Sequence, residues 1–212
     1  MREYHKIHNI FKRNPETNNK TFLLGQWSLP EFDFLQNNPW IFTEKVDGTN
    51  IRVIWDHENK KIKFDGKTDK SQIPTKLFTK LTEMFTIELM EKVFPQTSLC
   101  LYGEGYGTGI QTGGKYRKDQ SFVLFDVLVG KWWLQRQDIE EISSNLNIDI
   151  VPIVGEGTLF DGIDLVKNGF NSKWGNFIAE GIVAKPKVEL FSRNGSRIVA
   201  KIKYKDFNLK GE

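Results

Sequence analysis

Hydrophobic residues recur at helical spacing over Pro74–Val93, and this stretch is the clearest predicted helix in the chain. Further helices are predicted at 136–147, at 158–169 and, opened by a proline, at 30–35. Runs rich in β-branched and aromatic residues between turn-forming residues predict strands. These strands cover 41–56, 61–65, 98–104, 121–134, 150–154, 180–190 and 197–205. The element order predicts a mixed α+β fold rich in antiparallel strands.

A glycine-rich stretch from Gly103 to Gly114 interrupts this pattern and predicts a loop with an unusual backbone conformation. With 212 residues, the chain is expected to form a single domain over residues 1–212. No apolar run approaches the roughly 20 residues that span a bilayer. The N-terminus also lacks the apolar core of a signal peptide. We therefore expect a cytoplasmic monomer with no membrane partner.

The net charge of +3 is too small to identify a nucleic-acid-binding protein by itself. The charge is unevenly distributed, however, with eight lysine or arginine residues against four acidic residues between Glu180 and Glu212. Such clustering suits a phosphate-lined partner, although a solvated charged face is the commoner explanation. Cys100 stands alone between two leucines, and we expect it to be a buried apolar residue rather than a nucleophile.

The strongest chemical signal lies in Thr43–Asn50. Lys45 stands in a K-x-D-G sequence near the end of a predicted strand, and Asp47 and Gly48 supply a turn. A lysine held against apolar walls can lose its proton and become a nucleophile. K-x-D-G on its own is more often an ordinary surface hairpin. The segments that follow along the chain favour the nucleophile.

Five further segments follow Lys45 in order. They are Phe64–Asp69, Leu101–Gly105, Phe122–Val127, Glu180–Lys185 and Val199–Lys203. Together with Lys45 they resemble the motifs of the covalent nucleotidyltransferase superfamily of polynucleotide ligases and capping enzymes, from about residue 20 to residue 207. The resemblance implies an α+β nucleotidyltransferase (ATP-grasp-like) domain of antiparallel sheets flanked by helices. It also implies ATP and Mg²⁺ or Mn²⁺ as cofactors.

The resemblance assigns a role to each matching residue. Lys45 is the expected nucleophile, Glu180 the metal ligand, and Lys201 and Lys203 the catalytic contacts to phosphate. Strand alternation places Lys201 and Lys203 on one face, where both can hold a phosphate and offset the charge that develops during transfer. The other expected nucleotide-binding residues are Glu44, Asn50, Lys67, Glu104 and Phe122.

Among these residues, the resemblance makes Glu104 the ribose contact and Glu44 the contact to the adenine amino group. Phe122 and Phe125 cannot face the same side of one strand. We therefore assign Phe122 to stacking on the adenine and Phe125 to the core. Asp47 has two open interpretations, since it can orient the nucleophile or simply form the turn.

The chain departs from the family pattern in two places. Lys67 stands where an arginine is usual, and a lysine cannot make a forked bidentate contact to phosphate. Nine residues follow Lys203. That leaves no room for the OB-fold domain of DNA ligases and capping enzymes, or for the accessory domain of larger RNA ligases. We therefore expect a minimal catalytic domain.

We predict an ATP-dependent RNA ligase of the nick-sealing branch. It would form lysyl-AMP on Lys45, pass the AMP to a 5′-phosphate of RNA and join that end to a 3′-hydroxyl, in a nicked duplex, a hybrid or a single strand. Asn50 favours RNA, because DNA ligases usually carry arginine there. Asp47 leaves DNA open, because the RNA branch often has histidine at that position. The alternatives are a compact DNA nick ligase, a GTP-dependent capping enzyme and an inactive nucleotide- or RNA-binding module.

Overall fold

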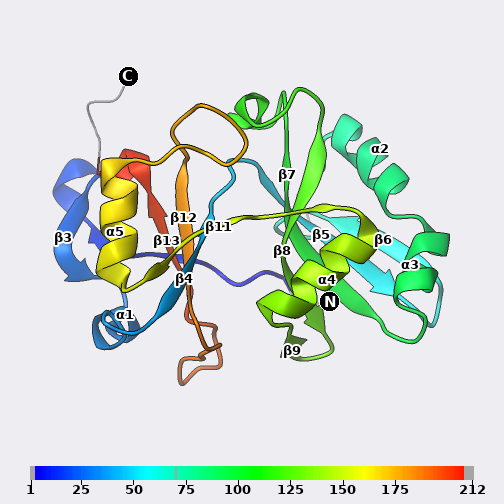
Figure 1. The fold of residues 1–212 in the computed structure, drawn as a ribbon, viewed down its shortest axis with the longest axis horizontal. Helices are drawn as coiled ribbons and strands as arrows, with labels where there is room; N and C mark the ends of the chain where they lie inside the picture. The colour runs from blue at the N-terminus through cyan, green and yellow to red at the C-terminus, as the bar shows by residue number, and fades with distance from the viewer. Residues whose placement is uncertain (1–2, 70, 208–212) are drawn as a thin grey trace. The chain divides into compact units, whose positions relative to one another are not determined.

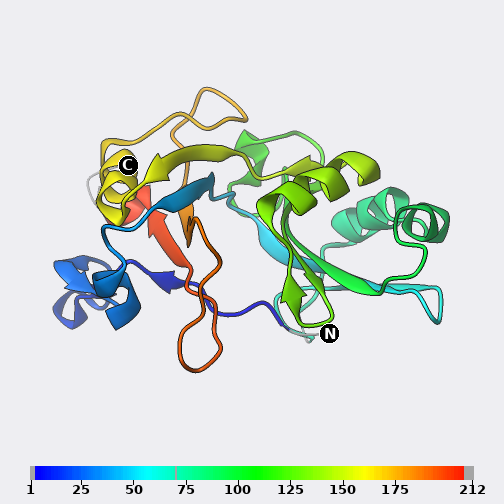
Figure 2. The same ribbon diagram turned by 60° about the horizontal axis from the view of Figure 1, so that its bottom comes forward.

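A computed structural model describes residues 3–69 and 71–207 of the chain. The chain divides into two compact units, drawn as ribbons in Figures 1 and 2. The first, unit 1, contains the residues up to Tyr4 and Asp47–Val151, and the second, unit 2, contains His5–Val46 and Pro152–Glu212. The predicted single domain over residues 1–212 stays a prediction.

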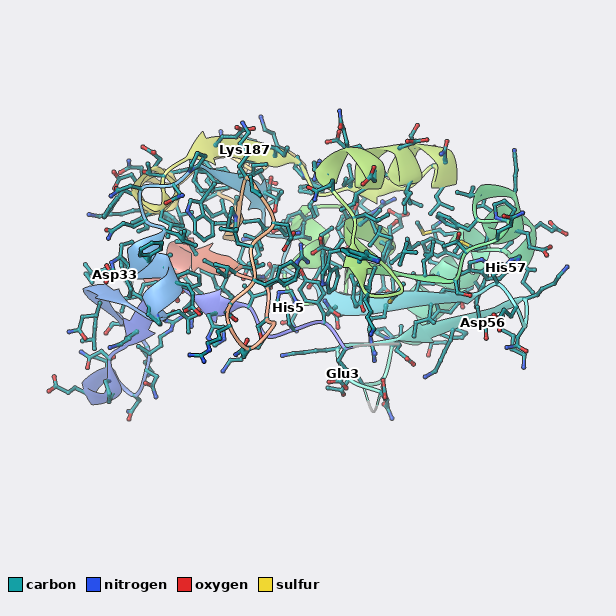
Figure 3. All side chains as sticks on the ribbon, turned by 90° about the horizontal axis from the view of Figure 1, so that it is seen from below. Glu3, His5, Asp33, Asp56, His57 and Lys187 are labelled. Atoms are coloured by element: carbon teal, nitrogen blue, oxygen red, sulfur yellow. The ribbon has the colours of Figure 1, made fainter. Side chains whose placement is uncertain are left out.

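Unit 1 is built on a six-stranded sheet with the strand order β10-β8-β7-β5-β6, in which β9 also pairs with β8. Its strands are β5 (Thr49–Asp56), β6 (Lys61–Asp65), β7 (Leu99–Tyr106), β8 (Ser121–Val129), β9 (Trp132–Trp133) and β10 (Asp149–Ile150). The central pairs are antiparallel, as predicted, whereas the short β10 runs parallel to β8. A turn at residues 57–60 joins β5 to β6, and Asp56 at the end of β5 and His57 at the start of the turn are labelled in Figure 3.

Three helices share one hydrophobic core with this sheet. They are α2 (Thr75–Met84), α3 (Ile87–Val93) and α4 (Arg136–Leu146). The predicted helix over Pro74–Val93 is therefore two helices. Thr86 separates them, because its hydroxyl accepts a hydrogen bond from the backbone N–H of Leu89 and caps the start of α3.

Unit 2 contains a five-stranded sheet with the order β1-β13-β12-β4-β11 and a separate pair, β2 with β3. The strands are β1 (His8–Asn9), β2 (Phe11–Arg13), β3 (Phe22–Trp27), β4 (Trp40–Glu44), β11 (Ile153–Gly157), β12 (Gly181–Pro186) and β13 (Ala200–Lys203). The β1–β13 pair is parallel, and the other pairs are antiparallel. None of β1, β2 and β3 was predicted.

Two helices accompany this sheet, α1 (Pro30–Phe34) and α5 (Leu159–Asn168), and both match predicted helices. Helix α5 packs against β11, β12 and β13 (Figure 1). Strand β4 alternates accordingly, so that Trp40, Phe42 and Glu44 are buried whereas Ile41 and Thr43 are half-buried. Short 3₁₀ turns lie at Pro15–Thr17, Gly113–Lys115 and Tyr204–Asp206.

The predicted strand over 41–56 is interrupted. It forms β4 in unit 2 and β5 in unit 1, and the chain crosses between the units after Val46. The predicted strands at 121–134 and 150–154 are likewise each divided in two. Over the part of the chain that the structure describes, no helix is both long and apolar enough to cross a membrane.

Candidate active site

The carboxylate of Glu180 lies between two lysine side chains in unit 2. Lys45 Nζ is 2.6 Å from Glu180 Oε2, and Lys203 Nζ is 2.7 Å from Glu180 Oε1. The side chains of Lys45, Glu180 and Lys203 expose 21%, 13% and 20% of their surface, so water screens these ion pairs less than it screens fully exposed pairs. We call these three residues the lysine–glutamate cluster.

Strand pairing brings the cluster together. The backbone N–H of Lys45, just after β4, donates to the carbonyl of Gly181 at 2.9 Å. Glu180 comes just before β12, and its carbonyl accepts from the N–H of Tyr204 at 2.8 Å. The β12–β13 register sets Gly181 opposite Lys203. The three side chains therefore lie together at the same end of three adjacent strands, β4, β12 and β13.

The predicted alternation of β13 is confirmed. Lys201 and Lys203 are half-buried, whereas Ala200 and Ile202 between them are buried in the core. Lys201 lies opposite Val183 in the β12–β13 register, two residues before the position that reaches Glu180. The structure therefore places Lys203 in the cluster and Lys201 next to it on the same strand.

Glu44 is buried, with 1% of its surface exposed, and strand alternation places it on the other face of β4 from Lys45. Its Oε2 accepts a hydrogen bond from the backbone N–H of Lys173 at 2.8 Å. Burial raises the pKa of Glu44, although hydrogen bonds from Lys173 and Ser172 partly oppose the shift. Glu44 Oε1 is buried with no hydrogen-bond partner in the described structure. An orphaned buried acceptor of this kind fits a ligand that brings its own donor.

In unit 1, Asn50 of β5 lies directly opposite Glu104 of β7. Glu104 is half-buried, and Asn50 Oδ1 is a second buried acceptor without a partner among the described residues. The close approach of β7 explains why the K-x-D-G sequence has a glycine, Gly48, at its last position. A Cβ atom there would lie 2.3 Å from the carbonyl oxygen of Gly105 and 2.9 Å from Cγ of Glu104, so a larger residue would force the chain away from β7.

Asp47 has a role that neither interpretation of the sequence included. Its Oδ2 accepts hydrogen bonds from the hydroxyl of Thr112 at 2.5 Å and from the N–H of Thr112 at 3.3 Å. Its own N–H donates to the hydroxyl of Tyr116 at 3.3 Å. Asp47 therefore anchors the glycine-rich loop between β7 and β8.

Phe122 and Phe125 belong to different clusters of side chains, as the alternation predicted. Phe122, however, has no exposed surface, and its ring packs edge-on against Phe85 with 5.4 Å between centroids. Phe125 is half-buried and packs against Tyr4. Stacking on adenine needs an open ring face, which Phe122 does not offer in this structure, and the predicted stacking stays a prediction. Phe122 is a core residue in this structure.

Lys67 is exposed, and a buried arginine that the sequence analysis missed holds the segment around it. Arg52 has no exposed surface; its Nε donates to the carbonyl of Gly66 at 3.0 Å and its Nη2 to Asp69 Oδ1 at 2.7 Å. This hydrogen bond from Arg52 lowers the pKa of Asp69. The available signal was an arginine between Ile51 and Val53 inside a predicted buried strand.

Cys100 is buried and free, as predicted, and burial raises the pKa of its thiol to about 11. A thiol that stays protonated at neutral pH is a poor nucleophile. Among the described residues, no group of three or more histidine, cysteine, aspartate or glutamate side chains is placed to hold a metal ion.

Antiparallel sheets with flanking helices, and a lysine paired with a carboxylate at the edge of three strands, define a nucleotidyltransferase-type domain. The match to the RNA ligase family extends over residues 38–204, most of the chain. The chain belongs to the RNA ligase family.

Solved structures of RNA ligase from Naegleria gruberi share this fold. One lysine-to-alanine variant with ATP and Mn has a TM-score of 0.66 at 20% identity, covering 85% of this chain and 53% of that chain. A second such variant, also with ATP and Mn, has a TM-score of 0.68 at 18% identity, with coverages of 97% and 58%. The ligase with pyrophosphate has a TM-score of 0.66 at 18% identity, covering 96% of this chain and 58% of that chain. This chain thus spans little more than half of those proteins. A comparison with curated protein sequences finds no match.

Proposed function

We propose that this chain is an ATP-dependent RNA ligase that forms lysyl-AMP on Lys45. The lysine–glutamate cluster carries the proposal, because it sets an amine beside a carboxylate and a second cation in a chain of the RNA ligase family. Lys45 Nζ would attack the α-phosphorus of ATP, so that an N–P bond forms and pyrophosphate leaves. The AMP would then pass to a 5′-phosphate of RNA, and a 3′-hydroxyl would displace it.

Glu180 is suited to control when Lys45 reacts. An amine that attacks phosphorus must be free to approach it, and the ion pair with Glu180 holds the Lys45 side chain in place. Each oxygen of Glu180 binds one lysine in this structure. Any change that draws Glu180 away would break both ion pairs at once. Lys45 could then approach the α-phosphorus, and Lys203 could turn its charge to the phosphates.

The donors fit a divalent ion that is held mainly by oxygen atoms of water and ATP. Glu180 offers one carboxylate, and Mg²⁺ commonly keeps several waters beside one or two protein carboxylates. When bound, the ion would neutralise part of the triphosphate charge. The Naegleria ligase structures with ATP and Mn support this choice of cofactors.

The orphaned acceptors support the assignment of nucleotide contacts. Glu44 Oε1 could accept a hydrogen bond from the amino group of adenine, and Asn50 Oδ1 could accept one from a hydroxyl or a water. Glu104 beside Asn50 is our candidate for the ribose. Lys67 and Lys201 are candidates for further phosphate contacts. Phe122 is left out of this proposal, because its ring is fully buried in this structure.

Intact-mass measurement after incubation with ATP and Mg²⁺ tests the proposal. One added AMP is expected on the wild-type chain and none on Lys45→Ala. Lys187→Ala is the matched control, since Lys187 pairs with Glu156 on the surface of the same unit and should leave the adduct intact. An adduct that persists in Lys45→Ala would refute the assignment, and no adduct on the wild type would favour an inactive binding module.

RNA is the proposed substrate, with a 5′-phosphate and a 3′-hydroxyl at the ends to be joined, and a DNA nick ligase is the alternative. Family membership and Asn50 in place of an arginine favour RNA. Sealing of matched nicks whose 3′-hydroxyl strand ends in ribose or in deoxyribose separates the two, because a 2′-hydroxyl is what distinguishes them. We expect faster sealing with ribose, and equal or faster joining of the all-DNA nick would favour the alternative.

A further inference from the structure

Unit 1 carries a polar groove of about 380 Å³ that the proposed nucleotide contacts do not use. One wall is helix α2 and the other is the end of the glycine-rich loop before β8. The groove, here called the lysine groove, is lined by Lys76, Thr79, Lys80, Glu83, Thr108, Lys118, Asp119 and Gln120. The lining contains no aromatic or aliphatic residue, and its side chains are three lysines, two carboxylates, two threonine hydroxyls and one amide.

The loop wall of the lysine groove is braced internally. Gln120 Nε2 donates to the carbonyl of Thr108 at 2.9 Å, and the hydroxyl of Thr108 donates to the carbonyl of Arg117 at 3.4 Å. Gly107 closes the loop with a φ of +122°, and a Cβ there would lie 2.0 Å from the carbonyl oxygen of Asp119. Because these contacts tie the two ends of the loop together, the groove is formed before any ligand binds.

The charges in the groove leave cations without a counterion. Lys76 and Lys80 lie one helical turn apart on α2, and Lys118 is on the loop wall. Arg117 binds Asp119 through two hydrogen bonds of 2.8 Å, and Glu83 lies 3.6 Å from Lys80. No ion pair to Lys76 or Lys118 is found in the described structure. The groove therefore offers these two cations to an anionic ligand.

We propose that the lysine groove binds the sugar-phosphate backbone of the RNA strand that is joined. This inference rests on the proposed function, because it takes RNA as the substrate. Lysines and hydroxyls bind phosphate and sugar without reading base edges. The absence of apolar or aromatic residues from the lining leaves no platform for stacking a base. Binding there would thus be independent of sequence, as a ligase that joins arbitrary ends requires.

A triple variant tests the lysine groove: Lys76→Ala, Lys80→Ala and Lys118→Ala. The matched control removes the same charge from exposed lysines of unit 1 outside the groove, with Lys61→Ala, Lys92→Ala and Lys131→Ala. Fluorescence anisotropy over a salt series, with a labelled single-stranded RNA that ends in a 5′-hydroxyl, measures binding without any reaction. Mass spectrometry measures adduct formation on Lys45, and thermal melting checks the fold.

The groove variant should bind RNA more weakly at every sequence tested. The magnitude of the slope of log affinity against log salt should fall by about 1.4, since Lys76 and Lys118 are the two cations offered to phosphate and each contact on a single strand contributes about 0.7. The control should keep the wild-type slope, and both should form the Lys45 adduct at the wild-type rate. If the triple variant does not fold, Lys118→Glu alone, on an exposed loop position, should still weaken RNA binding.

Unchanged RNA affinity and salt slope in a folded groove variant would overturn the inference. Loss of adduct formation in the groove variant with unchanged RNA binding would overturn it too, because the groove would then bind the phosphates of ATP and not RNA. A wild-type chain that forms no adduct would instead refute the proposed function. The RNA-binding measurement needs no ATP, so these two failures are distinguishable.

Discussion

Phe122→Ala tests whether this ring belongs to the core, as the structure has it, or to the nucleotide site, as the motif suggested. The ring is fully buried, lies against Phe85 and covers Gly103, where a Cβ would come within 2.2 Å of it. Truncation would leave a cavity, and Phe→Ala changes in cores cost about 3–5 kcal/mol. A domain of this size loses about 2–4 °C in Tm per kcal/mol, so Tm should fall by roughly 6–20 °C.

Phe125→Ala is the control, because the half-buried Phe125 has less contact to lose and should cost less. Calorimetry gives Tm for both variants, and ATP titration below the lower transition gives the affinity. We expect Phe122→Ala to melt early and to bind ATP as the wild type does. The core assignment is wrong if Phe122→Ala instead keeps its Tm and loses binding energy on the order of 1–3 kcal/mol, the size of a lost stacking contact.

Two further changes probe buried charge. Arg52→Lys should lower the free energy of unfolding by about 1–3 kcal/mol, because a lysine cannot hold both the Gly66 carbonyl and Asp69 and leaves a buried acceptor unsatisfied. Urea denaturation measures the loss, and an unchanged midpoint would show that the fork does not hold this segment. Glu44→Gln should change the pH dependence of stability. Burial raises the pKa of Glu44, so the folded state favours the protonated carboxyl. The resulting contribution to stability is fully present below the ordinary pKa of 4.5 and is lost as pH rises through the higher pKa of the folded state. The amide of the variant cannot ionise. Thermal melting over a pH series should therefore show the Tm of Glu44→Gln rising relative to that of the wild type above pH 4.5. A Tm difference that stays constant with pH would contradict this.

Local patterns in the sequence identified most elements, because helix and strand periodicity depend on neighbouring residues. Helices α4 and α5 and the alternation of β13 were predicted from spacing alone. The error over Pro74–Val93 has a local cause, since apolar spacing continues through a break that one threonine cap creates. Lys45, Glu180 and Lys203, which the structure brings together, were also singled out in the sequence, because ordered motifs carry them.

The tertiary structure alone decided how these residues meet. Lys45 and Glu180 are 135 residues apart, and the register of three strands sets their contact. Alternation showed that Phe122 and Phe125 lie on different faces of β8, but it could not show which face the helices would cover. The contacts of Arg52 and Asp47 were missed for the same reason, because their partners come from a separate turn and loop. Periodicity determines which side chains share a face, and only long-range packing determines what each face meets.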